Sequence, residues 1–216
     1  MDKTRSMKNI INCGVIAVIR DVSKNKIEKL AEALINGGIT NLEITVDHPH
    51  AFEMIRILRD KYIYDKVLIG AGTVLDVSTA KSAIYYGAEF IVSPAFDREI
   101  IKVSLRYNKI SIPGIFTPTE ALYAIEAGAD FIKLFPANSQ GPSFIKALKG
   151  PMPHIPIIPT GGIDLNNASD FIKAGSAAIG LGGSLINKSD VEQGNFKKIE
   201  DKAKKFIKMS EENRVR

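Results

Sequence analysis

The amino-acid sequence predicts an α/β fold, a single (β/α)8 TIM barrel over residues 1–216. Eight short apolar runs rich in β-branched residues alternate with longer segments of helical period, a pattern typical of parallel strands joined by helical crossovers. Eight such units close a barrel, and no linker or low-complexity stretch marks a second domain. An open doubly wound sheet is the competing architecture, but no Gly-x-Gly-x-x-Gly turn follows the first run.

The predicted strands are continuously apolar, as expected when helices cover both faces of a parallel sheet. In chain order they span residues 15–20, 41–45, 67–72, 90–93, 110–114, 131–135, 155–160 and 177–180. Active sites of such barrels lie at the carboxyl ends of the strands. The residues that end each run are therefore the candidates for function.

The helices between these strands are expected near residues 24–36, 50–62, 77–87, 97–107, 118–127, 141–149 and 166–174. Ser23 and Asp97 precede apolar residues at helical spacing and are the predicted N-caps of their helices. Gly87, Gly128 and Gly175 end three helices in the same helix-glycine-strand junction. The repeated junction indicates that one turn is reused along the chain.

A C-terminal amphipathic helix is expected from about residue 191 to residue 212, and the segment before the first strand is an N-terminal extension. The buried stripe of the helix is predicted to contain Phe196, Ile199, Ala203, Phe206 and Ile207. Residues 197–216 hold eight Lys/Arg and four Asp/Glu, so four of the five net positive charges lie there. We interpret this excess as a solvated helix face, because no tryptophan and no aromatic-basic interleaving indicates nucleic-acid binding.

The remaining composition argues against a membrane protein, a disulfide-bonded protein and a metalloprotein. Apolar runs are short and the N-terminus is charged, so we expect neither a membrane span nor a secretory signal. Cys13 is the single cysteine, which suits a cytoplasmic protein. His48, His50 and His154 lack the spacing of a zinc site, so we expect no metal.

Lys133 stands inside an apolar run that ends at Pro136. Burial disfavours the charged form of an amine, so a lysine in this position can supply the neutral nucleophile of imine chemistry. The alternative is a strand-end lysine whose stem packs while its ammonium group reaches water. Its place on the sixth of eight strands, among other polar strand ends, favours the nucleophile.

Glu43 and Arg20 are two further charged residues on apolar strands. Glu43 lies in the middle of the second run, where a carboxylate either pairs with Lys133 or transfers protons. Arg20 ends the first run, where it either caps a turn or holds an anionic substrate through bidentate hydrogen bonds. The residues alone leave both pairs of alternatives open.

The last two strands both end in paired glycines beside a hydroxyl group. The two loops contain Thr160, Gly161 and Gly162, and Gly182, Gly183 and Ser184. Barrels commonly bind phosphate between these loops, where glycines allow backbone N–H groups to approach an anion. A tight turn would explain either pair alone. Two pairs on consecutive strands predict a phosphate or carboxylate site.

Seven motifs follow one another between about Val15 and Ile186. They are LEIT at 42–45, GAGTVL at 70–75, SP at 93–94, KLFP at 133–136, GPSFIKA at 141–147, PTGG at 159–162 and GGS at 182–184. In order and spacing this set resembles the KDPG/KHG aldolase family, the 2-keto-3-deoxy-6-phosphogluconate and 4-hydroxy-2-oxoglutarate aldolases.

The resemblance implies a class I aldolase, a carbon-carbon lyase of carbohydrate metabolism in the Entner-Doudoroff pathway. The expected substrates are 2-keto-3-deoxy-6-phosphogluconate, cleaved to pyruvate and glyceraldehyde 3-phosphate, and/or 4-hydroxy-2-oxoglutarate, cleaved to pyruvate and glyoxylate. The galactonate-derived epimer is an alternative substrate. The resemblance also implies a homotrimer that needs no metal or organic cofactor. Two competing functions are a phosphosugar isomerase or epimerase barrel and a non-catalytic phosphate-binding barrel.

The resemblance also assigns the site residues. It implies that Lys133 is the Schiff-base lysine and Glu43 the acid/base, that Thr73 and Pro94 line the pyruvyl pocket, and that Phe135 packs beside the iminium. The phosphate would be received by Thr160, Gly161, Gly162, Gly182, Gly183 and Ser184.

One position departs from the family pattern. This chain has Asp47 where well-known members carry an arginine that contacts the substrate carboxylate. An aspartate cannot take that role, because its charge repels an anion. Some members instead place an arginine at the end of the first strand, so we expect Arg20 to make the contact.

Overall fold

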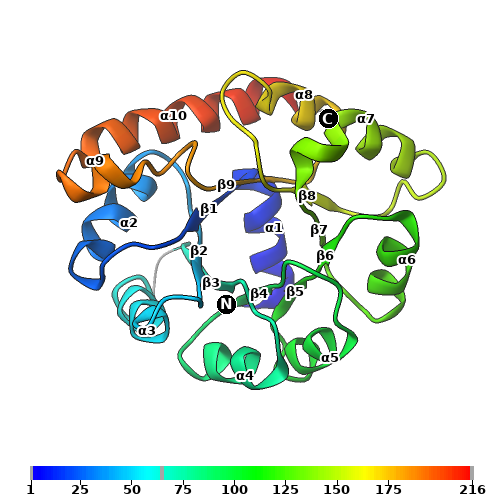
Figure 1. The fold of residues 1–216 in the computed structure, drawn as a ribbon, viewed down its shortest axis with the longest axis horizontal. Helices are drawn as coiled ribbons and strands as arrows, with labels where there is room; N and C mark the ends of the chain where they lie inside the picture. The colour runs from blue at the N-terminus through cyan, green and yellow to red at the C-terminus, as the bar shows by residue number, and fades with distance from the viewer. Residues whose placement is uncertain (1, 64–65, 215–216) are drawn as a thin grey trace.

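The computed structural model describes residues 2–63 and 66–214, and its strands form a closed ring surrounded by helices (Figure 1). The strands are β1 (Val15–Ile19), β2 (Asn41–Thr45), β3 (Leu68–Gly72), β4 (Phe90–Val92), β5 (Ile110–Ile112), β6 (Gly114–Ile115), β7 (Ile132–Leu134), β8 (Ile157–Pro159) and β9 (Ile179–Leu181). The helices are α1 (Lys3–Cys13), α2 (Ile27–Asn36), α3 (Ala51–Lys61), α4 (Val77–Tyr85), α5 (Arg98–Arg106), α6 (Pro118–Glu126), α7 (Ala137–Lys149), α8 (Ala168–Lys173), α9 (Lys188–Glu192) and α10 (Phe196–Asn213).

All strand pairs are parallel. They run in the order β5-β4-β3-β2-β1-β9 in one sheet and β6-β7-β8 in the other. A bridge between Thr160 and Gly180 joins the two sheets at β8 and β9, and β5 and β6 are consecutive pieces of one predicted strand. The predicted α/β barrel is therefore confirmed.

The fifth predicted strand is divided at Pro113, which separates β5 from β6. Proline has no N–H group to donate to a neighbouring strand, so the ladder is interrupted there. The Pro113 carbonyl still accepts a 2.8 Å hydrogen bond from the Lys133 backbone N–H. This contact keeps β7 in register with the chain that leads into β6.

The segment before the first strand forms helix α1, which the sequence had not predicted. α1 lies across the middle of the strand ring in Figure 1 and contacts β1, β2 and β5. Its Ile10 is fully buried and belongs to the same apolar cluster as Phe90 and Phe131 inside the barrel. α1 therefore covers the amino-terminal end of the strands and leaves the carboxyl end open.

The C-terminal helix is two helices rather than the one expected. Residues 193–195, among them Gly194 with φ of 75°, separate α9 from α10. The predicted stripe is confirmed, since Ile199, Ala203 and Phe206 are buried. The other two members, Phe196 and Ile207, pack against the core while half-buried. Among the described residues, no helix combines the length and the apolar character needed to cross a membrane.

The capping predictions have different outcomes. The Asp97 carboxylate accepts hydrogen bonds from the backbone N–H groups of Glu99 and Ile100, at 2.8 and 3.0 Å, and so caps α5. Ser23 is wrong as a side-chain cap, because a 3-10 turn follows it and its hydroxyl lies 2.8 Å from the Asn25 side-chain oxygen. The three glycine junctions are confirmed by left-handed φ angles of 108° at Gly87, 95° at Gly128 and 96° at Gly175.

Candidate active site

A cavity of about 590 Å³ lies at the carboxyl ends of the strands. Eleven of the twelve predicted site residues line it: Arg20, Thr73, Pro94, Lys133, Phe135, Thr160, Gly161, Gly162, Gly182, Gly183 and Ser184. The twelfth, Glu43, is buried beside Lys133. The structure thus brings residues from seven parts of the chain to one site.

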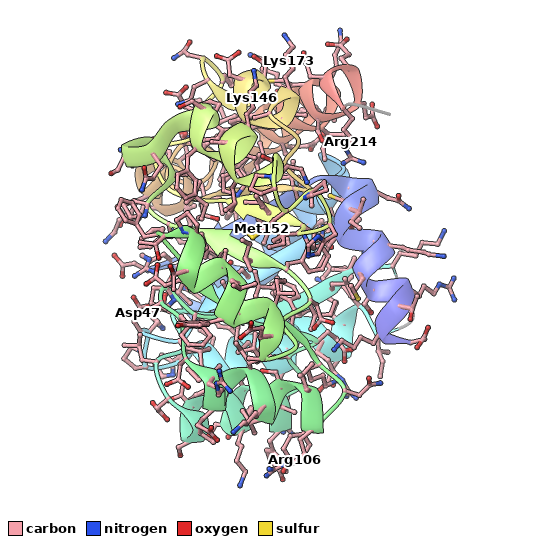
Figure 2. The ribbon with its side chains drawn as sticks, turned by 90° about the vertical axis from the view of Figure 1, so that its right-hand side faces the viewer. Asp47, Arg106, Lys146, Met152, Lys173 and Arg214 are labelled. Atoms are coloured by element: carbon pink, nitrogen blue, oxygen red, sulfur yellow. The ribbon has the colours of Figure 1, made fainter. Side chains whose placement is uncertain are left out.

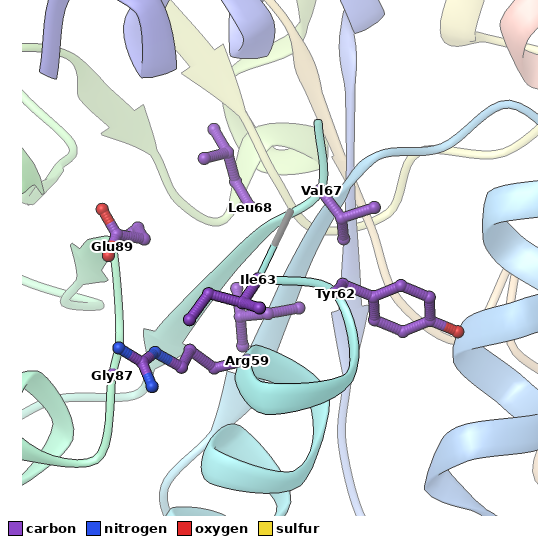
Figure 3. Close-up of a pocket in the computed structure, with 8 residues that line it drawn as sticks. Arg59, Tyr62, Ile63, Val67, Leu68, Gly87 and Glu89 are labelled. Atoms are coloured by element: carbon purple, nitrogen blue, oxygen red, sulfur yellow. The ribbon is translucent and has the colours of Figure 1, made fainter. Parts of the chain in front are cut away.

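A second, smaller cavity of about 120 Å³ lies at the opposite end of the strands (Figure 3). Leu68 at the start of β3, together with Arg59 and Glu89, lines it. None of the predicted site residues lies there. Barrel chemistry occurs at the carboxyl face, so we assign the candidate active site to the larger cavity.

Lys133 on β7 and Glu43 on β2 point into the barrel from different sides of the ring. Their side chains are 8 % and 4 % exposed, and Lys133 Nζ lies 4.0 Å from Glu43 Oε1. This distance exceeds that of a direct hydrogen bond, so the two groups attract each other without being locked together. An amine and a carboxylate are therefore held within reach of one substrate atom.

Glycines on β3 create the space that Glu43 occupies. A Cβ atom at Gly72 would lie 1.9 Å from Glu43 Oε1, and one at Gly70 would lie 2.3 Å from the Phe90 ring. Any other residue at these positions would displace the carboxylate or the barrel core. The Gly-Ala-Gly sequence of β3 therefore has a packing reason: it leaves room for Glu43 and Phe90.

Burial raises the pKa of Glu43, while the positive charges of Lys133 and Arg20 act in the opposite direction and do not cancel the effect. Glu43 Oε1 has no hydrogen-bond partner among the described residues. A carboxyl group with a raised pKa and a free oxygen can accept a proton and return it. This supports proton transfer over a purely structural ion pair.

The Phe135 ring lies beside the lysine, with its centroid 5.0 Å from Lys133 Nζ. An aromatic face at this distance attracts a cation. Phe135 is 38 % exposed, so one part of its ring contacts the lysine and another faces the open cavity. The ring can therefore stabilise a positive charge that develops on the lysine nitrogen.

The two glycine pairs differ in their structural need for glycine. Gly161 and Gly162 have φ angles of 97° and 70°, and a Cβ atom at Gly162 would lie 2.4 Å from that of Asn138. In contrast, a Cβ atom at Gly183 would meet no described atom within 4 Å. Chain packing explains the first pair but not Gly183. The absence of a side chain at Gly183 therefore fits a requirement of a ligand.

Arg20 is held by two side chains at the cavity. Its Nη1 forms an ion pair with Asp47 Oδ2, and its Nη2 donates a 2.7 Å hydrogen bond to Thr73 Oγ1. Thr73 has a φ of 58°, an unusual left-handed value for a β-branched residue that often marks functional sites. Arg20 thus bonds to side chains at neighbouring strand ends rather than to the carbonyls of its own turn.

Asp47 is the site residue to which sequence reasoning gave no role. The sequence showed only that a negative charge replaced the usual arginine. One signal in the sequence could have indicated the pair. Arg20 ends the first predicted strand and Asp47 follows the second, and consecutive strands of a barrel are neighbours, so the two opposite charges are expected to lie close together. The structure resolves the question by placing Asp47 against Arg20.

Comparison with known proteins gives a consistent result. The family model described as "KDPG and KHG aldolase" matches residues 7–202. The chain is 37 % identical over 172 residues to an Escherichia coli K12 protein named 2-dehydro-3-deoxy-6-phosphogalactonate aldolase, covering 79 % of this chain and 83 % of the relative. It is 34 % identical over 201 residues to a Pseudomonas aeruginosa 2-dehydro-3-deoxy-phosphogluconate aldolase, covering 93 % of this chain and 90 % of the relative.

A solved structure shows the same similarity. It is the KDPG aldolase of Legionella pneumophila with pyruvate captured as a covalent carbinolamine intermediate. It has a TM-score of 0.86 and 28 % sequence identity, and the match covers 92 % of this chain and 96 % of that one.

Proposed function

This chain belongs to the KDPG and KHG aldolase family and is an aldolase, and from this premise we propose which reaction it catalyses and with which residues. It is a class I aldolase that cleaves 2-keto-3-deoxy-6-phosphogluconate to pyruvate and glyceraldehyde 3-phosphate, and/or 4-hydroxy-2-oxoglutarate to pyruvate and glyoxylate. The observation that carries this proposal is the buried Lys133–Glu43 pair, with 4.0 Å between Nζ and Oε1 at the cavity.

Lys133 starts the reaction as the nucleophile. Its nitrogen adds to the C2 carbonyl of the 2-keto acid, and loss of water gives a protonated imine that withdraws electrons from C3 and C4. The Phe135 ring, 5.0 Å from the lysine nitrogen, stabilises the positive charge of this intermediate. No metal or organic cofactor takes part in this scheme.

Glu43 then removes the proton of the C4 hydroxyl group through a bound water. The C3–C4 bond breaks, its electron pair moves into the enamine of pyruvate, and the aldehyde leaves. Glu43 returns the proton to C3. Hydrolysis of the imine releases pyruvate and restores the free amine of Lys133.

The two ends of the substrate are bound by different parts of the cavity. Arg20 takes the carboxylate, and Thr73 and Pro94 line the pyruvyl pocket. The β8 and β9 loops, with Thr160, Gly161, Gly162, Gly182, Gly183 and Ser184, receive the phosphate. Support for the phosphate site comes from Gly183, whose lack of a side chain the chain's own packing does not require.

Gly183→Ala is expected to raise the KM for the phosphorylated substrate while leaving the melting temperature unchanged, because its methyl group meets only the ligand. Ser184→Ala is expected to raise the same KM by about 10- to 100-fold, the effect of losing one hydrogen bond to a charged group. Unphosphorylated 4-hydroxy-2-oxoglutarate is the matched control, measured by coupled detection of pyruvate. Equal effects on both substrates would place the phosphate elsewhere.

The galactonate-derived epimer, 2-keto-3-deoxy-6-phosphogalactonate, is the second candidate substrate. It is favoured by the 37 % identity to the Escherichia coli protein named for that activity. Asp47, which stands where well-known members of the family carry arginine, leaves the stereochemical preference to be measured. The values of kcat/KM for both epimers and for 4-hydroxy-2-oxoglutarate, measured as pyruvate release, decide among the three. No pyruvate from any of them would contradict the aldolase assignment.

We include a homotrimer, a cytoplasmic location and the Entner-Doudoroff pathway in the proposal. The trimer is supported by exposed Phe116, Leu122 and Tyr123 on and before α6, side chains of the kind that subunits cover. The unpaired Cys13 thiol suits a reducing compartment. Sedimentation equilibrium is expected to give three times the chain mass of 23.6 kDa. A single-chain mass at micromolar concentration would contradict the trimer.

A further inference from the structure

We propose that Asp47 is a positioning residue for Arg20. Its carboxylate, together with the Thr73 hydroxyl, fixes the guanidinium in the orientation that receives the substrate carboxylate. The inference rests on the proposed function, in which Arg20 binds that carboxylate. It gives Asp47, the residue that departs from the family pattern, a role in catalysis that does not require contact with the substrate.

The three residues form a clamp across neighbouring strands. Arg20 follows β1, Asp47 follows β2 and Thr73 follows β3, and these strands are adjacent in the sheet. Arg20 Nη1 binds Asp47 and Nη2 binds Thr73, so two of the five guanidinium N–H donors are used. Bonds from both terminal nitrogens fix the plane of the group. The remaining donors are available to an anion.

Asp47 lies outside the cavity wall, whereas Arg20 and Thr73 line it. Figure 2 shows Asp47 on the side of the molecule opposite α1, which is the side of the carboxyl strand ends. Its side chain is 39 % exposed and pairs with Arg20. Asp47 therefore acts on the substrate through Arg20 and not by direct contact.

The clamp matters because Arg20 is itself 55 % exposed. A free arginine at this position would sample many rotamers, and binding an anion would have to immobilise it. Prior ordering by Asp47 removes that cost from substrate binding. The negative charge of Asp47 opposes anion binding, but water screens it at this exposure. We therefore expect the ordering of Arg20 by Asp47 to outweigh the repulsion between Asp47 and the substrate carboxylate.

Pyruvate is the sharpest probe, because its carboxylate is its only anionic group. Enamine formation on Lys133 exchanges the pyruvate methyl protons with D2O, and NMR follows the exchange without an aldehyde. Asp47→Ala is expected to raise the KM for pyruvate by about 2- to 10-fold with kcat nearly unchanged, the cost of ordering one long side chain. Asp47→Asn keeps an acceptor oxygen and is expected to lie between wild type and Asp47→Ala.

The double variant separates positioning from a merely structural role. In an Arg20→Met background, Asp47→Ala is expected to cause no further rise in KM, because Asp47 has no arginine to orient. Asp60→Ala is the matched control, since it removes an exposed Arg–Asp pair of 2.8 Å, with Arg59, away from the larger cavity. Its KM is expected to equal that of wild type.

Two outcomes would overturn the role of Asp47. One is an unchanged or lowered KM in Asp47→Ala, and the other is an equal rise with and without Arg20. Failure of the proposed function looks different, because the wild-type protein would then exchange no pyruvate protons at all. That result would remove the aldolase reaction and, with it, the positioning role.

Discussion

Lys133→Met is expected to lower kcat by at least about 10⁴-fold, the loss typical when a covalent nucleophile is removed. Methionine fills nearly the same volume as the lysine stem, so the buried site on β7 remains packed. The imine cannot form without the amine, and substrate binding by the other cavity residues remains. The loss is therefore expected in kcat rather than in KM.

A direct measurement identifies the nucleophile. The protein is incubated with pyruvate, reduced with borohydride and digested for mass spectrometry, and the peptide that contains Lys133 is expected to carry the reduced pyruvyl adduct. Lys149 is an internal control, because burial lowers the pKa of that lysine, yet it bonds to the Pro153 and Ile155 carbonyls outside the larger cavity. A folded protein whose Lys133 peptide gains no adduct would refute the class I mechanism.

Glu43→Gln is expected to lower kcat by about 10²- to 10⁴-fold, the usual contribution of a general acid or base. Glutamine retains the shape that the space beside Gly72 accommodates but cannot accept the proton. The pyruvate adduct on Lys133 is still expected to form in this variant after long incubation. Its detection would show that the lysine remains reactive. Glu89→Gln, a partly buried carboxylate paired with Lys109 at the other end of the barrel, is the matched control and should retain activity.

The pH profile tests the same residue. Glu43 must be deprotonated to accept the C4 hydroxyl proton, so activity rises as pH rises through its pKa. Burial raises that pKa, and the acid limb of kcat/KM is therefore expected at a higher pH than that of a solvated glutamate. The limb should disappear from the residual activity of Glu43→Gln. An acid limb at the ordinary glutamate value, or one that persists in the variant, would assign it to another group.

Local patterns predicted the barrel well because strands and helix ends leave their own periodicity and turn residues in the sequence. The glycines at 87, 128 and 175 are examples, since a left-handed residue is needed at each junction. The predictions failed where a local sequence pattern is compatible with more than one structure. Residues 3–13 form a helix through contacts with the barrel end, and Gly194 divides the expected C-terminal helix.

The sequence alone determined which residues stand within the strands and which directly follow them, because that depends only on the order and period of the chain. Lys133 and Glu43 were placed within strands in this way, and the two glycine pairs were placed at strand ends. Only the tertiary structure decided the 4.0 Å separation of Lys133 from Glu43 and the binding of Arg20 by Asp47 and Thr73. Those contacts join residues far apart in the chain, and their distances are set by barrel closure and by the space that Gly72 leaves.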